Sequence, residues 1–478
     1  MRRPQAQPAA SFRDGNIAPA RRNSYRILLQ IATTDAHSDD LLRSPEVDGL
    51  SERDRALTTT LVLGTLRWQL VLDERIRELL ARPEAKLSAE AATALRMGAY
   101  QLLFLDRVPA HAVIHDAVEL VKQGKERGAA GMVNAVLRKV QSPGYRAQST
   151  EGRSAFGDPR SAHPAWMVER WVRRYGAEAT DAICRWDQEP AALAVRVDPG
   201  VELANVETEP GFFLTAARRV VGGDVSRSAA VREGRVRIQD EASQLVAEVL
   251  AVSVTGERDA GPVNVLDLCA APGGKTAILA ERLPNAEITA ADLSRKRLES
   301  MRRIMPEMFR ARMRFEVADA ARMELQPEWD LILCDVPCSG TGTMARNPEI
   351  RWRVGEADLS RQHARQVAIL RNGLRGLKAG GRLVYSTCSL EPEENEAVVA
   401  EALRATAGFA VVPIAGILDR LQERGVVTAE GRERLRSATE SNFLRTLPGV
   451  HPCDGFLAAV IERQGTGTRE PGNRVRGF

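Results

Sequence analysis

Apolar residues in the first third of the chain recur at intervals of three and four positions, which is the spacing of one face of an α-helix. Leu57, Leu61 and Trp68 illustrate this pattern, and Pro and Gly signals separate one such stretch from the next. The sequence therefore predicts an all-α bundle of short helices over residues 23–141. Residues 1–22 are rich in Arg, Pro and Ala and are expected to form a disordered basic tail.

A stretch rich in Pro, Gly and Ser follows the bundle, and we expect residues 142–164 to be a linker. Residues 165–235 begin with a helical pattern. Two later segments, 193–198 and 229–238, alternate between apolar and polar residues as strands do. We therefore expect a small α/β extension in front of a larger domain.

From about residue 236 the pattern changes to short apolar runs that alternate with helical stretches. The expected strands are Val263–Leu268, Glu287–Asp292, Met313–Asp319, Trp329–Val336, Arg382–Cys388 and Phe456–Glu462. Long helices are expected over 359–377 and 393–403. Repeated βα units predict a parallel, doubly wound α/β sheet over residues 236–464, followed by a basic tail at 465–478.

The composition narrows the cellular setting and the partners. No apolar run approaches the length of about eighteen residues that a membrane helix needs, so we expect no membrane association. The net charge of +4 is small, but only seven of the 67 basic residues are Lys. Arginine suits contacts with phosphates and bases, although a GC-rich genome would give the same bias. Six scattered cysteines without a secretory signal indicate a reducing cytoplasm, and no ligand set for a metal is apparent.

A first candidate site lies at the turn after the strand that begins near Val263. The run Val265–Thr276 joins a buried strand to a helix through Ala, Pro and Gly, and it matches neither the dinucleotide fingerprint nor the P-loop. Asp292 and Asp319 end the next two expected strands, at the edge where ligands bind. Each alone is commonly a turn residue. Together with the glycine turn they favour a cofactor that carries adenosine.

A second candidate site follows the fourth and fifth expected strands, which end in Asp335–Gly342 and Ser386–Ser389. These segments carry Cys338 and Cys388, and neighbouring strands would bring the two thiols together beside the cofactor. Carbon 5 of cytosine is a poor nucleophile until a thiolate adds to carbon 6, so this reaction requires a cysteine. A single cysteine is commonly a small buried hydrophobe, but two at adjacent strand ends favour catalysis. The residues alone do not say which thiol attacks.

Three segments of this domain resemble the RsmB/NOP/NSUN RNA m5C methyltransferases. They are Asp267–Lys275, Asp335–Gly342 and Tyr385–Asn395. Three supporting stretches agree, namely Ile238–Gln244, Arg346–Trp352 and Asp454–Phe456. The resemblance covers roughly residues 163–464 and implies an α/β Rossmann-like class I methyltransferase domain that uses S-adenosyl-L-methionine.

Segments of the helical bundle resemble a NusB-like RNA-binding domain. They are Leu95–Leu103, Val108–Val113 and Val133–Arg138. A NusB-like domain in front of this catalytic domain is typical of the members that methylate one cytosine, position 967, of bacterial 16S rRNA. The implied partner is therefore 16S rRNA or the assembling small ribosomal subunit. Nothing in the sequence favours more than a monomer.

The resemblance also implies roles for individual residues. The cofactor pocket would be lined by Cys269, Ala270, Ala271, Pro272, Gly273, Gly274 and Lys275. Asp292 would hold the ribose and Asp319 would lie near the adenine. Asp335 would sit between cofactor and base and polarise the cytosine, with Lys275 orienting it. Cys388 would be the nucleophile and Cys338 would assist product release.

Two alternatives stay open at this point. One keeps the chemistry but changes the substrate to tRNA or to a different rRNA site. The other is a ribosome-assembly factor that binds RNA without catalysis, against which the complete set of motifs argues. The Lys and Arg residues near the end of the helical bundle fit RNA binding, but they equally fit a solvated face.

Overall fold

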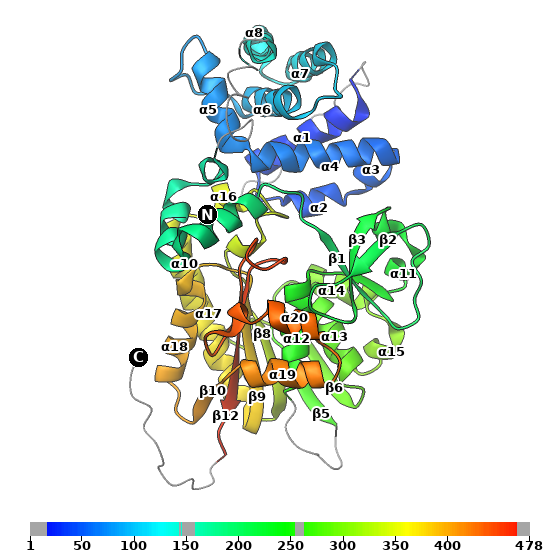
Figure 1. Ribbon diagram of the computed structural model, residues 1–478, viewed down its shortest axis with the longest axis vertical. Coiled ribbons are helices and arrows are strands. Elements are labelled where there is room, and N and C mark those ends of the chain that lie inside the picture. The colour runs from blue at the N-terminus through cyan, green and yellow to red at the C-terminus, as the bar shows by residue number, and fades with distance from the viewer. Residues whose placement is uncertain (1–16, 143–144, 146–157, 254–261, 466–478) are drawn as a thin grey trace. The chain divides into compact units, whose positions relative to one another are not determined.

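The computed structural model describes residues 17–142, 145, 158–253 and 262–465 (Figure 1). The chain divides into two compact units. The first comprises Met1–Pro190 together with Met344–Arg353, and the second comprises Ala191–Thr343 together with Val354–Phe478. Parts of the two expected tails and of the expected linker lie outside the described residues.

The first unit is helical, as the spacing of apolar residues predicts (Figure 1). Its α-helices in the described ranges are α1 (Pro19–Thr33), α2 (Ser38–Leu42), α3 (Pro45–Asp48), α4 (Glu52–Arg67), α5 (Gln69–Leu79), α6 (Ala89–Phe104), α7 (Ala110–Gln123), α8 (Ala130–Gln141), α10 (Ala165–Trp186) and α16 (Ile350–Arg353). Leu61, Leu72 and Leu120 are fully buried in one core. Gly64 permits close packing of α4 and α6, because a Cβ there would lie 2.0 Å from the ring of Tyr100.

The expected boundary of the N-terminal tail is wrong. Helix α1 begins at Pro19, inside the segment 1–22 that we expected to be disordered. Arg21 is buried, and it donates to Asp116 at 2.8 Å and to Gln101 at 2.7 Å. A basic residue in a Pro-rich stretch looks like tail in the sequence, but here its charge is neutralised in the core by a partner 95 positions away.

Helix α10 belongs to the first unit, whereas the sequence placed residues 165–235 with the catalytic domain. Met167 and Trp171 are buried on this helix, and the ring of Trp171 meets that of His163 edge-on. His163 in turn contacts the buried Asp187 at 3.1 Å, just past the end of α10. These contacts anchor the helix at both ends.

A segment from the middle of the methyltransferase sequence, Met344–Arg353, also belongs to the first unit. Arg351 is fully buried and donates to the carbonyl oxygens of Arg67 (2.6 Å) and Asp187 (2.9 Å). Glu349 accepts from both the amide (2.8 Å) and the hydroxyl (2.9 Å) of Ser38, at the start of α2. The stretch Arg346–Trp352, which supported the resemblance, therefore has a structural role in the helical unit.

The second unit begins with a small antiparallel sheet of four strands in the order β2-β3-β1-β4. Strand β1 (Leu193–Val197) was expected. The expected strand at 229–238 is instead a short helix, α11 (Ala229–Arg232), followed by β4 (Val236–Ile238). Strands β2 (Glu207–Pro210) and β3 (Ala217–Gly222) lack a clear alternating pattern and were not predicted. The small sheet thus extends past the boundary expected at residue 236.

The large sheet has eight strands in the order β10-β12-β9-β8-β5-β6-β7, with β11 paired to β12. The strands are β5 (Val263–Asp267), β6 (Ala286–Asp292), β7 (Met313–Val317), β8 (Trp329–Asp335), β9 (Leu377–Thr387), β10 (Phe409–Val412), β11 (Leu444–Thr446) and β12 (Phe456–Arg463). Strands β5 to β9 run parallel, as predicted, whereas β10, β11 and β12 pair antiparallel. The domain is therefore Rossmann-like with a mixed sheet.

Helices cover both faces of the large sheet (Figure 1). They are α12 (Glu241–Ala251), α13 (Gly274–Arg282), α14 (Arg295–Ile304) and α19 (Ala415–Glu423) on one face, and α17 (Glu356–Gly376) and α18 (Glu396–Arg404) on the other. Successive side chains of a strand point to opposite faces. Leu331 and Leu333 accordingly pack in the first layer, and Ile332 and Cys334 in the second. No helix in the described ranges has the length and apolarity that a membrane crossing requires.

Candidate active site

The motif loops meet at one edge of the large sheet, where the parallel strands β5, β6, β7, β8 and β9 end. This placement follows from the strand order, because the carboxyl ends of parallel strands share an edge. The structure thereby brings the glycine turn after β5, Asp292, Asp335 and the two cysteine loops to the same side of the sheet. Asp319 follows β7 by two residues and lies toward the end of this row.

The turn between β5 and α13 is built from small residues that leave room for a ligand. Gly273 has φ +104°, and a Cβ there would lie 2.6 Å from the side chain of Met301. Ala270 and Ala271 are buried, and the Ala271–Pro272 bond is cis. The backbone at this helix start is therefore free of bulky side chains, as binding of a polar or anionic group requires.

Asp292 and Asp319 both make the local turn contacts that such residues commonly make. Asp292, 4% exposed, accepts from the amides of Ala271 (3.2 Å) and Ser294 (2.8 Å). Asp319 accepts from the amide of Ala321 at 3.0 Å. An ionised carboxylate offers about four acceptor positions, so each retains capacity for a ligand hydroxyl or amino group.

The residues at this edge fit an adenosine cofactor with an amino-acid tail. The Oε1 atom of Gln239 is buried and has no hydrogen-bond partner among the residues that the structure describes, and it lies where a Cβ on Gly274 would meet it at 3.0 Å. A buried orphan acceptor beside the glycine turn is suited to an ammonium or hydroxyl group of a ligand. Gln239 lies within the stretch Ile238–Gln244, but nothing in the sequence pattern shows that its oxygen is unsatisfied, so the sequence predicts no role for it.

Asp267, the last residue of β5, is a further site residue that received no individual role from the sequence. Burial raises the pKa of its carboxyl to about 7, opposed by the hydrogen bond from the Thr276 hydroxyl at 2.7 Å. The folded protein therefore holds a proton here that the unfolded chain releases above pH ~4. Its contribution to stability is present at low pH and is lost as the pH rises to about 7.

We expect Asp267→Asn to remove this pH dependence. Relative to the variant, the unliganded wild-type protein should gain about 1 kcal/mol in free energy of unfolding for each pH unit below 7, down to pH ~5. Urea unfolding of both proteins at pH 5, 6, 7 and 8 measures the difference. Parallel stability profiles would show that Asp267 is ionised across this range.

Lys275 and Asp335 form an ion pair at the centre of the edge. The Lys275 ammonium donates to one Asp335 oxygen at 2.7 Å, and the hydroxyl of Ser386 donates to the other at 2.7 Å. Lys275 comes from the glycine turn, Asp335 from the end of β8, and Ser386 from β9, where it lies opposite Asp335. The ion pair therefore connects the cofactor turn with the strand ends that carry the cysteines.

The two cysteine thiols are in contact. The Sγ atoms of Cys338 and Cys388 are 3.3 Å apart, on the loops that follow the paired strands β8 and β9. The hydrogen bond with Cys388, then burial and nearby negative charge, hold the pKa of Cys338 well above its usual range. Cys338 therefore keeps its proton at neutral pH. Burial also raises the pKa of Cys269 and Cys334, so these thiols are poor nucleophiles.

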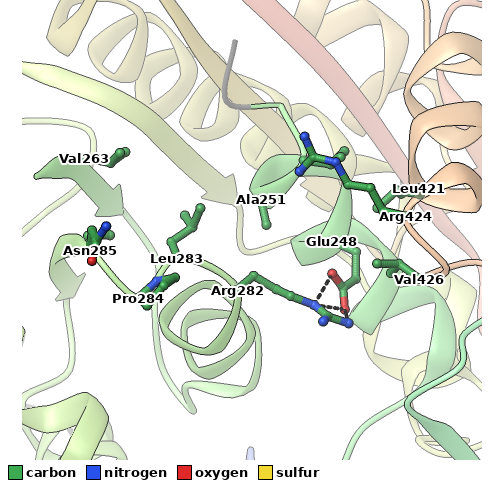
Figure 2. Close-up of a pocket in the computed structure, with 12 residues that line it drawn as sticks. Glu248, Ala251, Val263, Arg282, Leu283, Pro284, Asn285, Leu421, Arg424 and Val426 are labelled. Carbon is green, nitrogen blue, oxygen red and sulfur yellow. Dashed lines mark hydrogen bonds and ion pairs between the residues drawn. The ribbon is translucent and has the colours of Figure 1, made fainter. Parts of the chain in front are cut away.

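A cavity of about 460 Å³ opens at the opposite edge of the sheet, and Figure 2 shows the side chains that line it. Val263 and Ala286, the first residues of β5 and β6, lie in its wall. Its Arg282 is bound to Glu248, as the dashed lines show. None of the residues predicted for catalysis or cofactor binding lines it, so it is separate from the candidate site.

Among the described residues, no group of three or more His, Cys, Asp or Glu is arranged to hold a metal ion.

Comparisons with known proteins identify both parts of the chain. Residues 257–462 match the sequence family described as 16S rRNA methyltransferase RsmB/F, and residues 18–142 match the NusB family. Residues 163–201, which contain α10 and the first strand of the small sheet, match the ferredoxin-like domain of RsmF/B-like methyltransferases.

Whole-length relatives give the same result. The chain is 30% identical to the Bacillus subtilis protein named probable ribosomal RNA small subunit methyltransferase B, over 92% of this chain and 97% of that protein. It is 32% identical to ribosomal RNA small subunit methyltransferase B of Serratia proteamaculans, over 86% and 91%. The crystal structure of PH0851 has the same fold, with a TM-score of 0.73 at 22% identity, covering 94% of this chain and 99% of that one.

Proposed function

Because the chain belongs to the 16S rRNA methyltransferase RsmB/F family, we propose that it transfers a methyl group from S-adenosyl-L-methionine to carbon 5 of a cytosine in 16S rRNA, at position 967. The observation that carries this proposal is the contact of the Cys338 and Cys388 thiols, 3.3 Å apart, beside the Lys275–Asp335 ion pair. Methyl transfer to nitrogen or oxygen needs no thiol, whereas transfer to carbon 5 requires one.

The bond changes follow from the chemistry of the base. The Cys388 thiolate adds to carbon 6 of the cytosine, and this bond places electron density on carbon 5. S-adenosyl-L-methionine supplies an electrophilic methyl group when it is bound. With the methyl group on carbon 5 and S-adenosyl-L-homocysteine as the leaving group, the carbon 5 proton passes to water, the carbon 5–carbon 6 double bond re-forms, and the Cys388 thiolate leaves.

Cys338, Asp335 and Lys275 assist these steps. Because the raised pKa keeps Cys338 protonated, Cys338 is suited to exchange a proton with Cys388 as the product is released. Asp335 accepts a hydrogen bond from the cytosine or its protonated ring nitrogen and so favours thiolate addition. Lys275 fixes the orientation of Asp335 through the 2.7 Å contact.

The cofactor residues are assigned by their position at the strand ends. We assign the ribose to Asp292, the adenine edge to Asp319, and the methionine part to the turn Cys269–Lys275. The orphan oxygen of Gln239 adds an acceptor beside that turn. A base in a stacked strand cannot reach a thiol, so the target cytosine must be unpaired or flipped out.

The NusB-like domain is assigned to docking of the surrounding RNA. Of its basic residues, Lys122 is paired with Glu119 at 2.7 Å and Lys139 donates to the Leu79 carbonyl at 3.0 Å. Arg127 and Lys125 are exposed on the same part of the domain. Lys122 and Lys139 are exposed as well, but because their ammonium groups already have partners, Lys125 and Arg127 are the better candidates for phosphate contacts.

Bisulfite sequencing of rRNA and tRNA from a strain that lacks this chain tests the substrate. We expect one cytosine of 16S rRNA to lose its methylation and to regain it when the wild-type gene is restored. Loss confined to a tRNA, or to another rRNA position, would favour the alternative substrates. An unchanged methylation map would favour the assembly factor that binds RNA without catalysis.

A further inference from the structure

The two cysteine loops share one anchor, the carboxylate of Glu394. Each cysteine is followed by a serine, Ser339 after Cys338 and Ser389 after Cys388. Both serine hydroxyls donate to the same oxygen of Glu394, that of Ser389 at 2.5 Å. The Ser339 amide donates to the other oxygen at 2.8 Å. One side chain is thus bonded to the residue next to each thiol.

Helix α17 completes this arrangement. Its buried Gln366 donates to Glu394 at 3.1 Å and to the carbonyl oxygen of Pro337, directly before Cys338, at 2.9 Å. Glu394 therefore accepts four hydrogen bonds, which is about the full capacity of an ionised carboxylate. The two serine hydroxyls also lie 3.1 Å from each other, so the carboxylate and both serines form one hydrogen-bonded cluster between the loops.

Among the described residues, the charge of Glu394 has no counter-ion. Glu394 is fully buried, and within the described ranges no Lys or Arg lies within ion-pair distance of it. A buried charge without a cation is costly, and an apolar or amide side chain would be the better choice for stability alone. The position therefore favours a functional reason for a carboxylate.

We propose that Glu394 is the positioning residue of the active site, which holds the Cys338 and Cys388 loops at the separation that lets both thiols act on one base. This inference rests on the proposed function for its consequence in turnover. The loops are also joined by a backbone bond from Gly342 to the Cys388 carbonyl at 2.9 Å. That bond acts on the backbone of Cys388 itself, whereas Glu394 acts on Ser339 and Ser389, the residues that directly follow the two cysteines.

The negative charge of Glu394 also affects the pKa of the Cys338 thiol. The high pKa of Cys338 arises first from the hydrogen bond with Cys388, then from burial, and also from the negative charge of Glu394. Removing that charge should therefore make Cys338 lose its proton at lower pH. A variant with a neutral side chain should be a slower enzyme with a more reactive Cys338, a combination that simple loosening of the fold does not predict.

The test compares Glu394→Gln with a matched control, Glu401→Gln. Glu401 lies on α18, and its carboxylate pairs with His363 (2.9 Å) and Arg371 (3.4 Å), both on α17. We expect E394Q to lower kcat by about 10²-fold with KM for RNA unchanged, because a small displacement of a reacting group has an effect of this size. E401Q should retain the wild-type kcat. Equal kcat values for E394Q and the wild type would overturn the proposal.

Alkylation by iodoacetamide, followed by mass spectrometry of the Cys338 peptide, gives a readout that does not depend on RNA. In E394Q the pH midpoint for alkylation of Cys338 should fall below that of the wild type, so that labelling at a fixed pH below the midpoint is faster. An unchanged midpoint would contradict the proposal. If the wild-type chain methylated no RNA, the proposed function would fail, while this measurement would still decide the role of Glu394.

Should E394Q fail to fold, Ser339→Ala and Ser389→Ala remove one bond each. We expect each to lower kcat by about tenfold, in line with the loss of about 1.4 kcal/mol of positioning energy. In the double variant, kcat should fall by less than the product of the two single reductions, since both serines act through one carboxylate. Wild-type kcat in both single variants would overturn the proposal.

Discussion

Cys388→Ser should abolish methyl transfer to RNA, because a serine hydroxyl does not add to carbon 6 of cytosine at neutral pH. Binding of cofactor and RNA should persist, since the substitution exchanges one atom in a half-buried loop. A tritium-transfer assay from labelled S-adenosyl-L-methionine measures the loss. Cys184→Ala, in α10 of the helical unit, serves as the control and should retain wild-type activity.

Cys338→Ser should block product release and leave the methyl-transfer step intact, unlike Cys388→Ser. Methyl transfer should still occur once, but release of the product should fail, because the protonated thiol 3.3 Å from Cys388 is missing. We expect an RNA–protein complex that survives denaturing electrophoresis. The double variant C338S/C388S should form no such complex. A stable complex with C388S and none with C338S would reverse the roles of the two cysteines.

Asp335→Asn should lower kcat by roughly 10²–10³-fold, the usual effect of removing one preorganised electrostatic contact to a reacting group. An amide cannot accept from both Lys275 and Ser386, which now donate to the two Asp335 oxygens at 2.7 Å each. The negative charge that assists thiolate addition is lost as well. Steady-state kinetics with saturating cofactor measure this change.

Lys378→Met is the matched control for Lys275→Met. Lys378 forms a similar ion pair, with Asp330 at 3.1 Å, but it lies near the start of β9 and away from the strand ends that carry the cysteines. We expect K275M to reduce kcat nearly as much as D335N, and K378M to leave it unchanged. Similar losses in K275M and K378M would mean that the ion pair stabilises the fold and has no part in catalysis.

The sequence predicted the elements that have strong apolar periodicity. Helices of the NusB-like domain and the parallel strands β5 to β9 were located correctly, because buried runs such as Val265–Asp267 are unmistakable. Short strands with mixed burial, such as β2 and β10, were missed. The antiparallel direction of β12 was not foreseen either, since the apolar pattern of a buried strand is the same in both directions.

The boundaries of the two structural units could not be predicted where they depend on contacts between residues far apart in the sequence. Arg351 looks like a surface residue in a charged stretch. It is nevertheless buried, and it donates to the carbonyl oxygens of Arg67 and Asp187. Arg21 was likewise assigned to a tail although Asp116 neutralises it. In both cases the partner that makes burial of the charge possible lies about a hundred or more positions away, where local patterns carry no signal.

The residues of the candidate active site could be predicted from the sequence, whereas the contacts between them are seen only in the structure. Chemistry required a thiol, and the strand order explained why Cys338 and Cys388 meet. The contact of Lys275 with Asp335 agrees with the orienting role that the family resemblance implied. Gln239 and Glu394 stood in quoted motifs without a role. Their importance depends on unsatisfied or shared hydrogen bonds, which a sequence does not reveal.

The central claim is that Cys388 forms a covalent bond to a cytosine of RNA, and one measurement tests it most directly. The complex trapped with C338S is digested with nuclease and protease, and mass spectrometry locates the modified peptide. We expect a methylated cytidine nucleotide attached to the peptide that contains Cys388. A nucleotide on a different residue, or the absence of any covalent complex with an otherwise folded variant, would contradict it.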